Sequence, residues 1–497
     1  MGAELFDLRP ALAPLVSAIC AGLVMLVGYR PGWRAGLALA APVLKFGVVW
    51  SMLPGALAGT TYRISFGEVL PGLAFAFRVD ALGLFFALVS STLWIAATVY
   101  ALAYMRGRPG QQRFFGFFAL CVSTTVGIAF AENLMTLFVF YELLTVCTYP
   151  LLMHDGGLRV RRAGRRYLVY TLSGGALILA GMLLVWHLAG TLSLAGNGIL
   201  SGVDSRPALL AVFVMLTAGF GVKAAIMPLH AWLPSAMVAP VPVSALLHAV
   251  AVVKAGAFGL LRVIYNVFGV DLMRELGYAQ VLGAVAGATI ILASIVALRQ
   301  QRLKPLLAWS TISQLSYIVL AASLLTPAAA VAAIIHLANQ AFAKITLFFA
   351  VGAIERGTGK TRIDELDGIG YRMPLVMGAF TVASLSFIGV PLLAGFITKW
   401  YLSLGALEAG AGGYVALLAV SALLNAMYWL PILYRAFFRR PESPAPVRPV
   451  SLMMRLPTLV CAIYVVILGI GAEAPAMPFV LAESAVRFAF GMHGVAP

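Results

Sequence analysis

Long apolar runs, repeated along almost the whole chain, restrict the fold of this sequence more than any other feature. The 497 residues are 62% apolar and only 10% charged, whereas soluble domains carry roughly 25% charged residues. A bilayer core about 30 Å thick needs about 20 apolar residues per helix, because an α-helix rises about 1.5 Å per residue. The sequence therefore predicts an all-α integral membrane protein with about 14 transmembrane helices.

The positions of the spans follow from apolar runs of this length between polar breaks. They lie near residues 11–29, 35–53, 81–104, 114–131, 133–153, 167–190, 207–231, 241–266, 277–298, 305–325, 328–354, 374–402, 412–434 and 452–472. The start of the chain lacks the n-region, h-region and cleavage-site pattern of a secretory signal peptide. We therefore expect the first run to be retained as a span.

The distribution of basic residues predicts the orientation in the membrane. A formal net charge of +16 could indicate a nucleic-acid partner. However, the odd-numbered connections between spans carry 22 Lys and Arg, whereas the even-numbered connections and both ends carry 7. This bias follows the positive-inside rule, so nucleic acid is not needed to explain the charge. It predicts a multi-pass protein of the bacterial cell inner membrane, embedded in the lipid bilayer, with both termini on the periplasmic side.

With Arg262 and Arg455, near the ends of their apolar runs, counted in the connections, five basic residues remain inside the predicted spans, and all of them are lysines: Lys45, Lys223, Lys254, Lys344 and Lys399. Arginine does not lose its proton in proteins, whereas a buried lysine can. The counting leaves no arginine inside a span, so we interpret the lysines as groups that load and unload protons. An ionisable side chain deep in a bilayer costs at least about 2.5 kcal/mol, which favours a function for the four deeper lysines. Lys45 could equally snorkel from a short span to the interface, and its role stays open.

Acidic and metal-binding residues are scarce in the spans. Glu142 is the only acid well inside one, and His230, His248 and His336 are the histidines that accompany the lysines. His230 could instead be a hydrogen-bonded core residue beside a helix break. Sodium prefers hard oxygen ligands, including carboxylates, so we expect this chain to move protons and to hold no metal and no cofactor. Any Na+ or K+ would then be bound through partner subunits.

Helix-breaking residues recur near two of the lysines. Pro228 follows Lys223 by five residues, and Gly389 and Pro391 precede Lys399. Proline removes a backbone hydrogen bond, which predicts broken helices at spans 7 and 12 with polar cavities around them. The two breaks lie five spans apart, which indicates two inverted five-helix repeats.

The repeats divide the chain into four predicted regions. They are an N-terminal three-helix region (1–112), a first five-helix repeat (113–268), a second five-helix repeat (274–437) and a C-terminal helix with its tail (438–497).

Several segments resemble the antiporter-like membrane subunits shared by respiratory complex I, Mrp-type cation/proton antiporters and membrane-bound hydrogenases. They are FYELLTVCTYPLL, GFGVKAAIMPLHAWLPSAMVAPVPVSALLHAVAVVKAG, LKPLLAWSTISQLSYIVL, HLANQAFAKITLFF and GVPLLAGFITKWY, spread over about residues 80–435. The resemblance implies that Glu142 pairs with Lys223. It also implies a hydrated relay along the membrane plane that continues through Lys254 with His248, Lys344 with His336, and Lys399. Other membrane subunits of a hetero-oligomeric complex are the implied partners.

The subtype rests on a few positions. Lys254, Lys399 and the tyrosine of YELLT look most similar to the D-type subunit of Mrp antiporters, which implies monovalent cation/proton antiport. Gln340 stands where some relatives have a second histidine, so a relay through His336 would be less complete. The alternative is a proton-pumping subunit of another complex: a complex I-like enzyme, a hydrogenase or an inorganic-carbon uptake complex. In a complex I-like enzyme the chain would be part of a translocase.

Two readings from other classes remain. A self-contained carrier for an organic solute should offer a midplane pocket with varied polar and aromatic ligands, and the embedded lysines argue against it. An inert scaffold should use its embedded charges only to pair with each other. Substituting the lysines by arginine distinguishes a scaffold from a proton relay, because arginine keeps the charge and cannot release the proton.

Overall fold

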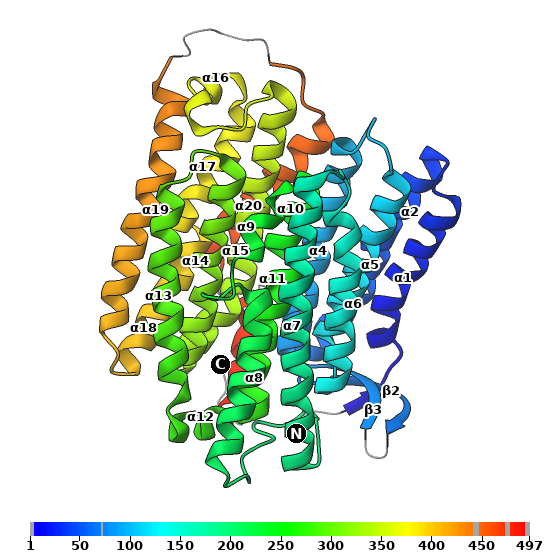
Figure 1. Ribbon diagram of the computed structural model, residues 1–497, viewed down its shortest axis with the longest axis vertical. Helices are drawn as coiled ribbons and strands as arrows, with labels where there is room; N and C mark the ends of the chain where they lie inside the picture. Colours follow the sequence, from blue (N-terminus) through cyan, green and yellow to red (C-terminus); the bar gives the residue numbers. More distant parts are fainter. Residues whose placement is uncertain (1–3, 71–72, 441–446, 473–477, 493–497) are drawn as a thin grey trace.

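The computed structural model describes residues 4–70, 73–440, 447–472 and 478–492. Within these ranges, 13 helices are long and apolar enough to cross a membrane, and the shorter apolar helix Pro374–Ile388 starts the twelfth predicted span. The predicted fold class of an all-α integral membrane protein is confirmed, and the spans form one elongated bundle (Figure 1).

The spans follow the predicted order. They are α1 (Arg9–Val27), α2 (Pro31–Trp50), α4 (Ala81–Tyr104), α5 (Gln111–Ala129), α6 (Leu134–Leu152), α7 (Leu158–Ala189), α8 (Arg206–Ala224), the composite eighth span (Val241–Phe268), α13 (Tyr278–Leu298), α14 (Leu303–Ser323), α15 (Pro327–Thr358), the pair α17 (Pro374–Ile388) and α18 (Ala394–Glu408), α19 (Gly413–Phe438) and α20 (Leu452–Ile470). The eighth span consists of α10 (Val241–Ala245), the π-helix η2 (Leu246–Val250), α11 (Val252–Arg262) and the π-helix η3 (Val263–Phe268). The short elements are α3 (Leu53–Leu57), α9 (Trp232–Ser235), η1 (Ala236–Val238), α12 (Val270–Leu276), η4 (Ile363–Glu365), α16 (Ile369–Arg372) and α21 (Pro478–Ala489).

The two predicted helix breaks are present. Span 7 is helical as α8 up to Ala224, and α9 begins only at Trp232 after an irregular segment. Span 12 is interrupted between Ile388 and Ala394. The inverted symmetry of the two repeats and the four region boundaries stay predictions, and residues 493–497 of the predicted tail lie outside the described residues.

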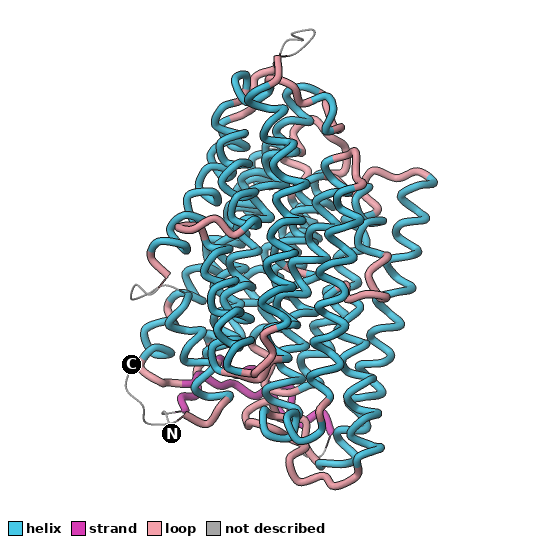
Figure 2. Tube along the Cα trace, turned by 90° about the vertical axis from the view of Figure 1, so that its left-hand side faces the viewer, coloured by secondary structure: helices cyan, strands magenta, loops and turns pink. Residues whose placement is uncertain are grey.

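A small sheet at one end of the bundle was not predicted. It contains β1 (Glu4–Phe6), β2 (Thr61–Leu70) and β3 (Leu73–Val79) in the order β1-β2-β3. β1 runs parallel to β2, and β3 is antiparallel to it, with Tyr62 opposite Val79 and Ile64 opposite Phe77. These four side chains are buried, as expected for alternating residues on one face of a strand. The sheet and both ends of the described chain lie at the same end of the bundle (Figure 2), which we call the terminus face.

The eighth span and α15 form the centre of the bundle, because both are buried along their whole apolar length. In contrast, α1, α2 and α19 are mostly exposed, with leucine and valine side chains that face the surroundings of the bundle. Span 6 extends further than predicted. α7 begins at Leu158, so Arg159–Arg166 lie on the first turns of a helix instead of in a loop.

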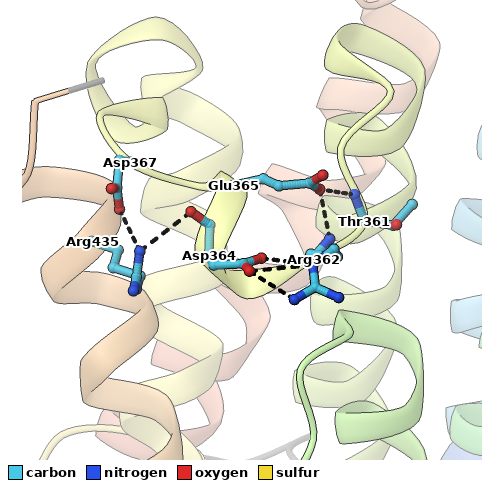
Figure 3. Close-up of polar contacts among 6 residues, drawn as sticks. All are labelled: Thr361, Arg362, Asp364, Glu365, Asp367 and Arg435. Atoms are coloured by element: carbon cyan, nitrogen blue, oxygen red, sulfur yellow. Dashed lines mark hydrogen bonds and ion pairs between the residues drawn. The ribbon is translucent and has the colours of Figure 1, made fainter. Parts of the chain in front are cut away.

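A network of hydrogen bonds and ion pairs between charged residues lies at the end of the bundle opposite the terminus face (Figure 3). Arg362 holds Asp364 at 2.7 Å, and Glu365 accepts hydrogen bonds from the amides of Thr361 and Arg362 at 3.0 and 2.9 Å. Arg435 of α19 pairs with Asp367 at 3.1 Å. The network ties the connection between α15 and α16 to α19 and so fixes the end of the second predicted repeat.

Candidate functional site: a row of buried lysines

Four of the predicted lysines lie in successive elements of the bundle interior. Lys223 is in α8, Lys254 in α11, Lys344 in α15 and Lys399 in α18. The first three are at most 2% exposed, and Lys399 is partly exposed. We call these four residues, together with Glu142 of α6, the lysine row. None of the ion pairs found among the described residues involves a lysine.

Lys223 lies in the last turn of α8, directly before the break. Its Nζ donates a 2.6 Å hydrogen bond to the backbone carbonyl of Tyr141 in α6 and lies 3.4 Å from the centroid of the Tyr141 ring. Both contacts are of the kind that stabilises an ammonium without neutralising it. Lys223 therefore reaches the residue that precedes Glu142 in the sequence.

Glu142 lies close to this contact but does not form a direct ion pair with Lys223 in the described structure. Its Oε1 is buried and has no hydrogen-bond partner among the described residues. The carboxylate packs against α7 at Gly175, where an added Cβ would lie 2.5 Å from Oε1. The predicted pair is thus brought together through Tyr141, and Gly175 provides the space for the carboxylate.

The break in span 7 is stabilised from inside its own segment. The indole Nε1 of Trp232 donates a 2.7 Å hydrogen bond to the Val222 carbonyl at the end of α8, which also accepts from the amide of Ala225 at 3.1 Å. His230 lies in the break, with its ring 5.2 Å from Trp309 of α14. No hydrogen bond joins His230 to a lysine of the row within the residues described, which is more consistent with a bracing role than with a relay.

The eighth span contributes His248 and Lys254. His248 lies in η2, fully buried, with its ring 5.1 Å from Phe348 of α15. Neither ring nitrogen of His248, nor Nζ of Lys254, has a hydrogen-bond partner in the described part of the chain. Buried polar atoms without partners are uncommon in proteins, so these groups are candidates for contact with internal water.

α15 carries His336 and Lys344 two turns apart. The hydroxyl of Ser310 in α14 is a hydrogen-bond partner of the Lys344 ammonium, which also lies 4.5 Å from the centroid of the Phe387 ring. Nδ1 of His336 lies 3.1 Å from the hydroxyl of Thr398, the residue next to Lys399. His336 is therefore connected to the neighbourhood of Lys399 more directly than to Lys344, with which the resemblance grouped it.

Gln340 takes part in this region as well. Its Nε2 donates a weak 3.4 Å hydrogen bond to the backbone carbonyl of His248. The side chain therefore joins α15 to η2, but it offers no titratable group at the position where some relatives have a second histidine.

Lys399 binds the end of its own broken span. Its Nζ donates to the carbonyls of Phe387 and Ile388, at 3.0 and 2.6 Å, where α17 ends. It also lies 5.9 Å from the centroid of the Tyr317 ring. A helix C-terminus carries a partial negative charge and unpaired carbonyls, so it is a suitable neighbour for an ammonium.

Lys45 is separate from the row. It is fully buried in α2, and its Nζ lies 5.4 Å from the centroid of the Trp94 ring of α4. α2 lies at the edge of the bundle opposite α18 (Figure 1). Burial rules out that Lys45 snorkels to the interface in this structure, but no contact connects it to the row among the described residues.

One buried charge pair was missed by the sequence reading. Arg262 was counted in a connection, whereas it lies in α11 at 2% exposure and binds Asp80 through two hydrogen bonds of 2.5 and 2.8 Å. The expectation that all embedded bases are lysines is therefore wrong at this position. Burial alone would raise the pKa of Asp80, but Arg262 and the Gly83 amide outweigh it and hold this pKa below its usual value. The sequence already indicated this position, because Arg262 lies four residues before the end of the predicted span 241–266.

The sequence matches two known families. Residues 131–425 match the family described as "NADH:quinone oxidoreductase/Mrp antiporter, TM", and residues 71–115 match "NADH-Ubiquinone oxidoreductase (complex I), chain 5 N-terminus". The first match covers the row from Glu142 to Lys399. Its extent is more than half of the chain.

Curated relatives come from two kinds of complex. The chain is 34% identical over 482 residues to NADH-quinone oxidoreductase subunit N of Desulforudis audaxviator, which covers 93% of this chain and 95% of that protein. It is 32% identical over 430 residues to a probable K(+)/H(+) antiporter subunit of Rhizobium meliloti, which covers 84% of this chain and 42% of that protein. The chain thus spans nearly the whole of the first relative and less than half of the second.

Solved structures show the same fold. A chain in the structure of the Mrp complex from Dietzia sp. superposes with a TM-score of 0.89 at 23% identity, over 98% of both chains. A chain of the membrane-bound sulfane sulfur reductase, an archaeal respiratory membrane complex, superposes with a TM-score of 0.87 at 24% identity, over 97% of this chain and 98% of that chain. Together with the family match and the nearly full-length relative, this fold agrees with the motifs around the buried lysines, and the chain belongs to the NADH:quinone oxidoreductase/Mrp antiporter transmembrane family.

Proposed function

We propose that this chain translocates protons through the lysine row, as an antiporter-like subunit of a multisubunit membrane complex. The observation that carries the proposal is the absence of a carboxylate partner for each lysine of the row among the described residues. A purely structural charge in a membrane is normally paired with an opposite charge. Lys223, Lys344 and Lys399 contact carbonyls, a hydroxyl and aromatic faces. Nζ of Lys254 has no hydrogen-bond partner among the described residues. The loss of a proton from any of the four lysines therefore breaks no direct ion pair.

His336 and Lys344 are close enough for the charge of one to influence the proton affinity of the other. His336 and Lys344 are eight residues apart on α15, which corresponds to about 12 Å along a helix. At that distance and an effective dielectric constant of about 20, two unit charges interact by about 1.4 kcal/mol, or about tenfold in proton affinity. A proton that arrives at one group therefore favours release from the next, and repeated steps of this size can move charge along the membrane plane.

The break at each end of the row supplies the polar surroundings that a proton relay needs. Irregular backbone inside a membrane is tolerated where it lines a polar or water-containing cavity. Lys223 lies at the break of span 7 and Lys399 at the break of span 12. Glu142 is the one acid beside the row, and its charge favours the protonated form of Lys223.

For the coupled process we favour monovalent cation/proton antiport of the Mrp type. The D-type pattern of Lys254 and Lys399 supports it, and so do the antiporter relatives and the Mrp complex with the same fold. The nearly full-length match to subunit N supports the second candidate, a proton-pumping subunit of a quinone-reducing complex. Membrane vesicles distinguish the two: antiport gives proton flux that depends on added Na+ or K+, and redox pumping gives flux that depends on a reductant and a quinone.

The lysine substitutions test the relay itself. Lys223→Arg and Lys399→Arg keep a positive charge but cannot release a proton. We expect both to lower proton flux in vesicles nearly as much as Lys223→Ala and Lys399→Ala, with the amount of assembled complex checked in parallel. Full flux in both arginine variants would show that the lysines are structural and would support the scaffold reading.

The orientation can be tested independently. We propose that the terminus face is periplasmic and that the arginine-rich start of α7 is cytoplasmic, since basic residues gather at that end. A reporter inserted directly before α7, at residues 155–157, should be active only in the cytoplasm, and one fused after Gly491 only in the periplasm. The reverse pattern would invert the proposed direction of every proton path in the molecule.

A further inference from the structure

A cavity of about 200 Å³ opens at the terminus face, away from the lysine row. It lies between the segment before β2, the start of α4, the end of the eighth span and α21. Its lining includes Thr60, Arg78, Asp80, Arg262, Tyr265 and Ser484. No part of the proposed relay uses these residues.

Several residues that line the cavity carry buried polar atoms without a hydrogen-bond partner. Arg262 binds Asp80 through its two terminal nitrogens, but its Nε has no hydrogen-bond partner among the residues described, and the same holds for Nε of Arg78 and the hydroxyl of Tyr265. Buried polar groups are almost always satisfied by protein or by water. A cavity of about 200 Å³ has room for several water molecules, and Asp80, Arg262 and the other polar side chains of its mixed polar and apolar lining offer them hydrogen-bond partners.

A single helix face connects the cavity to the row. Arg262, Phe258 and Lys254 are spaced four residues apart on α11, so their side chains lie on one face. The Arg262 guanidinium lies 4.9 Å from the centroid of the Phe258 ring. Phe258 in turn stacks on Phe86 of α4, with ring centroids 5.0 Å apart. Along this helix face, Phe258 lies between Lys254 and Arg262, which lines the cavity. The Nζ of Lys254 has no hydrogen-bond partner in the described ranges.

We propose that this cavity is the water-filled passage through which Lys254 exchanges protons with the terminus face, and that Phe258 and Phe86 form its gate. The inference rests on the proposed proton function and names the access route for that function. When the gate is dry, an apolar constriction blocks water. When Phe258 moves aside, the Lys254 ammonium gives a proton to a cavity water. The products are a neutral amine and a hydronium ion, which passes its proton to bulk water, and the reverse steps load the lysine.

Asp80 and Arg262 are positioning residues in this scheme. Asp80 accepts a 2.7 Å hydrogen bond from the Gly83 amide and so caps α4, while it fixes the guanidinium on the Phe258 ring. The pair therefore links the start of the helix that carries Phe86 to the end of the helix that carries Phe258 and Lys254.

Thiol labelling tests whether the passage contains water. Leu82 lines the cavity and is 6% exposed, whereas Ser91 lies on the same helix, away from the cavity lining, and is 0% exposed. The native cysteines are buried. In right-side-out and inverted vesicles, Leu82→Cys should react with a small membrane-impermeant methanethiosulfonate only from the terminus face, and Ser91→Cys should not react. An unreactive Leu82→Cys would overturn the proposal, since a water-filled passage must admit the reagent.

Flux measurements test the role of the ion pair. Asp80→Asn keeps an oxygen that can cap Gly83 and removes only the charge that holds Arg262. We expect proton flux in the assembled complex to fall by at least about fivefold. The matched control is Asp7→Asn, which removes the 2.6 Å Asp7–Arg9 ion pair at the same end of the molecule and should leave flux unchanged. Unchanged flux in Asp80→Asn would exclude a role for the pair.

Lys254→Ala distinguishes a wrong access route from a wrong proton relay. If Lys254→Ala loses flux while Asp80→Asn and the labelling show no effect, only the access route is wrong. If Lys254→Ala retains full flux, the proton relay itself is wrong. The labelling needs no change in Asp80 or Arg262, so it remains informative even if the charge variant does not assemble.

Discussion

Spans 7 and 12 are both interrupted next to a lysine, but the lysine lies before the interruption in span 7 and after it in span 12. In span 7, Lys223 is in the last turn of the first half-helix, before the irregular segment. In span 12, Lys399 follows the irregular segment, in the second half-helix α18. The Lys399 ammonium lies at the carbonyl end of the first half-helix α17, where the partial negative charge of a helix C-terminus favours a cation, whereas the Lys223 ammonium reaches across to α6.

The surroundings of the two lysines differ more than their positions. Lys399 donates to the last carbonyls of its own span and is partly exposed. Lys223 is fully buried and reaches across to α6, where it contacts Tyr141 beside the only embedded glutamate of the predicted spans. The comparison indicates that the charge of Lys223 is governed by a neighbouring acid, whereas that of Lys399 is governed by a fixed helix end.

Among the substitutions that test the difference between Lys223 and Lys399, Glu142→Gln should have the largest effect on proton flux. The amide keeps the shape of the side chain but removes the charge that favours protonated Lys223, so we expect proton flux to fall by at least about tenfold. Flux in vesicles and the abundance of the assembled complex are the measurements. A Glu142→Gln complex that assembles and transports normally would reduce Glu142 to a packing residue and make the two breaks equivalent.

Gly175→Ala should have an intermediate effect, because it acts on the same carboxylate indirectly. The new Cβ would lie 2.5 Å from Oε1 of Glu142, so the side chain must move. We expect a partial loss of flux. Gly22→Ala in α1 is the control, since nothing lies within 4 Å of the added carbon.

Gly389→Ala is the matching change at the second break. Its Cβ would lie 2.8 Å from Cδ of Lys399, and φ at this residue is +96°. Alanine is strained in this backbone conformation, so we expect lower thermal stability of the purified complex together with lower flux. Gly175→Ala should change flux with a smaller change in stability. Equal stability losses in the two variants would contradict the distinction between a displaced carboxylate and a strained break.

The smallest effects are expected for substitutions that keep the aromatic rings beside the lysines. Tyr141→Leu removes the ring 3.4 Å from Lys223, and a cation–π contact is worth about 0.5–2 kcal/mol, or roughly a 2- to 30-fold change in flux. Tyr141→Phe should be nearly neutral, because the hydroxyl has no hydrogen-bond partner among the described residues. Tyr317→Phe should also change flux little, since it keeps the ring 5.9 Å from Lys399, although it lowers stability by removing the buried 2.7 Å hydrogen bond to Ser421 of α19.

If Tyr141→Phe is as harmful as Tyr141→Leu, the hydroxyl is needed. The ring contact would then not account for the position of Lys223, and the first break would have to be reinterpreted around the Tyr141 hydroxyl.

The sequence alone determined the membrane class, the order of the spans, the two breaks and the four deep lysines. These features depend on local properties: the length of an apolar run, the missing amide of a proline, and the cost of a charge in a bilayer. Each can be read along the chain without knowing which helices are neighbours. The roles that the resemblance gave to Glu142 and the lysines stay predictions, and the structure shows only in which elements these side chains lie.

Only the tertiary structure decided which atoms meet across helices. It placed Tyr141 between Glu142 and Lys223, joined His336 to Thr398 beside Lys399, and buried Arg262 against Asp80, 182 residues away in the sequence. It also formed the sheet at the terminus face, from segments read as connections. Such contacts depend on how each helix is rotated and how closely it packs, for example on the room that Gly175 leaves for a carboxylate, and a hydrophobic pattern does not record that geometry.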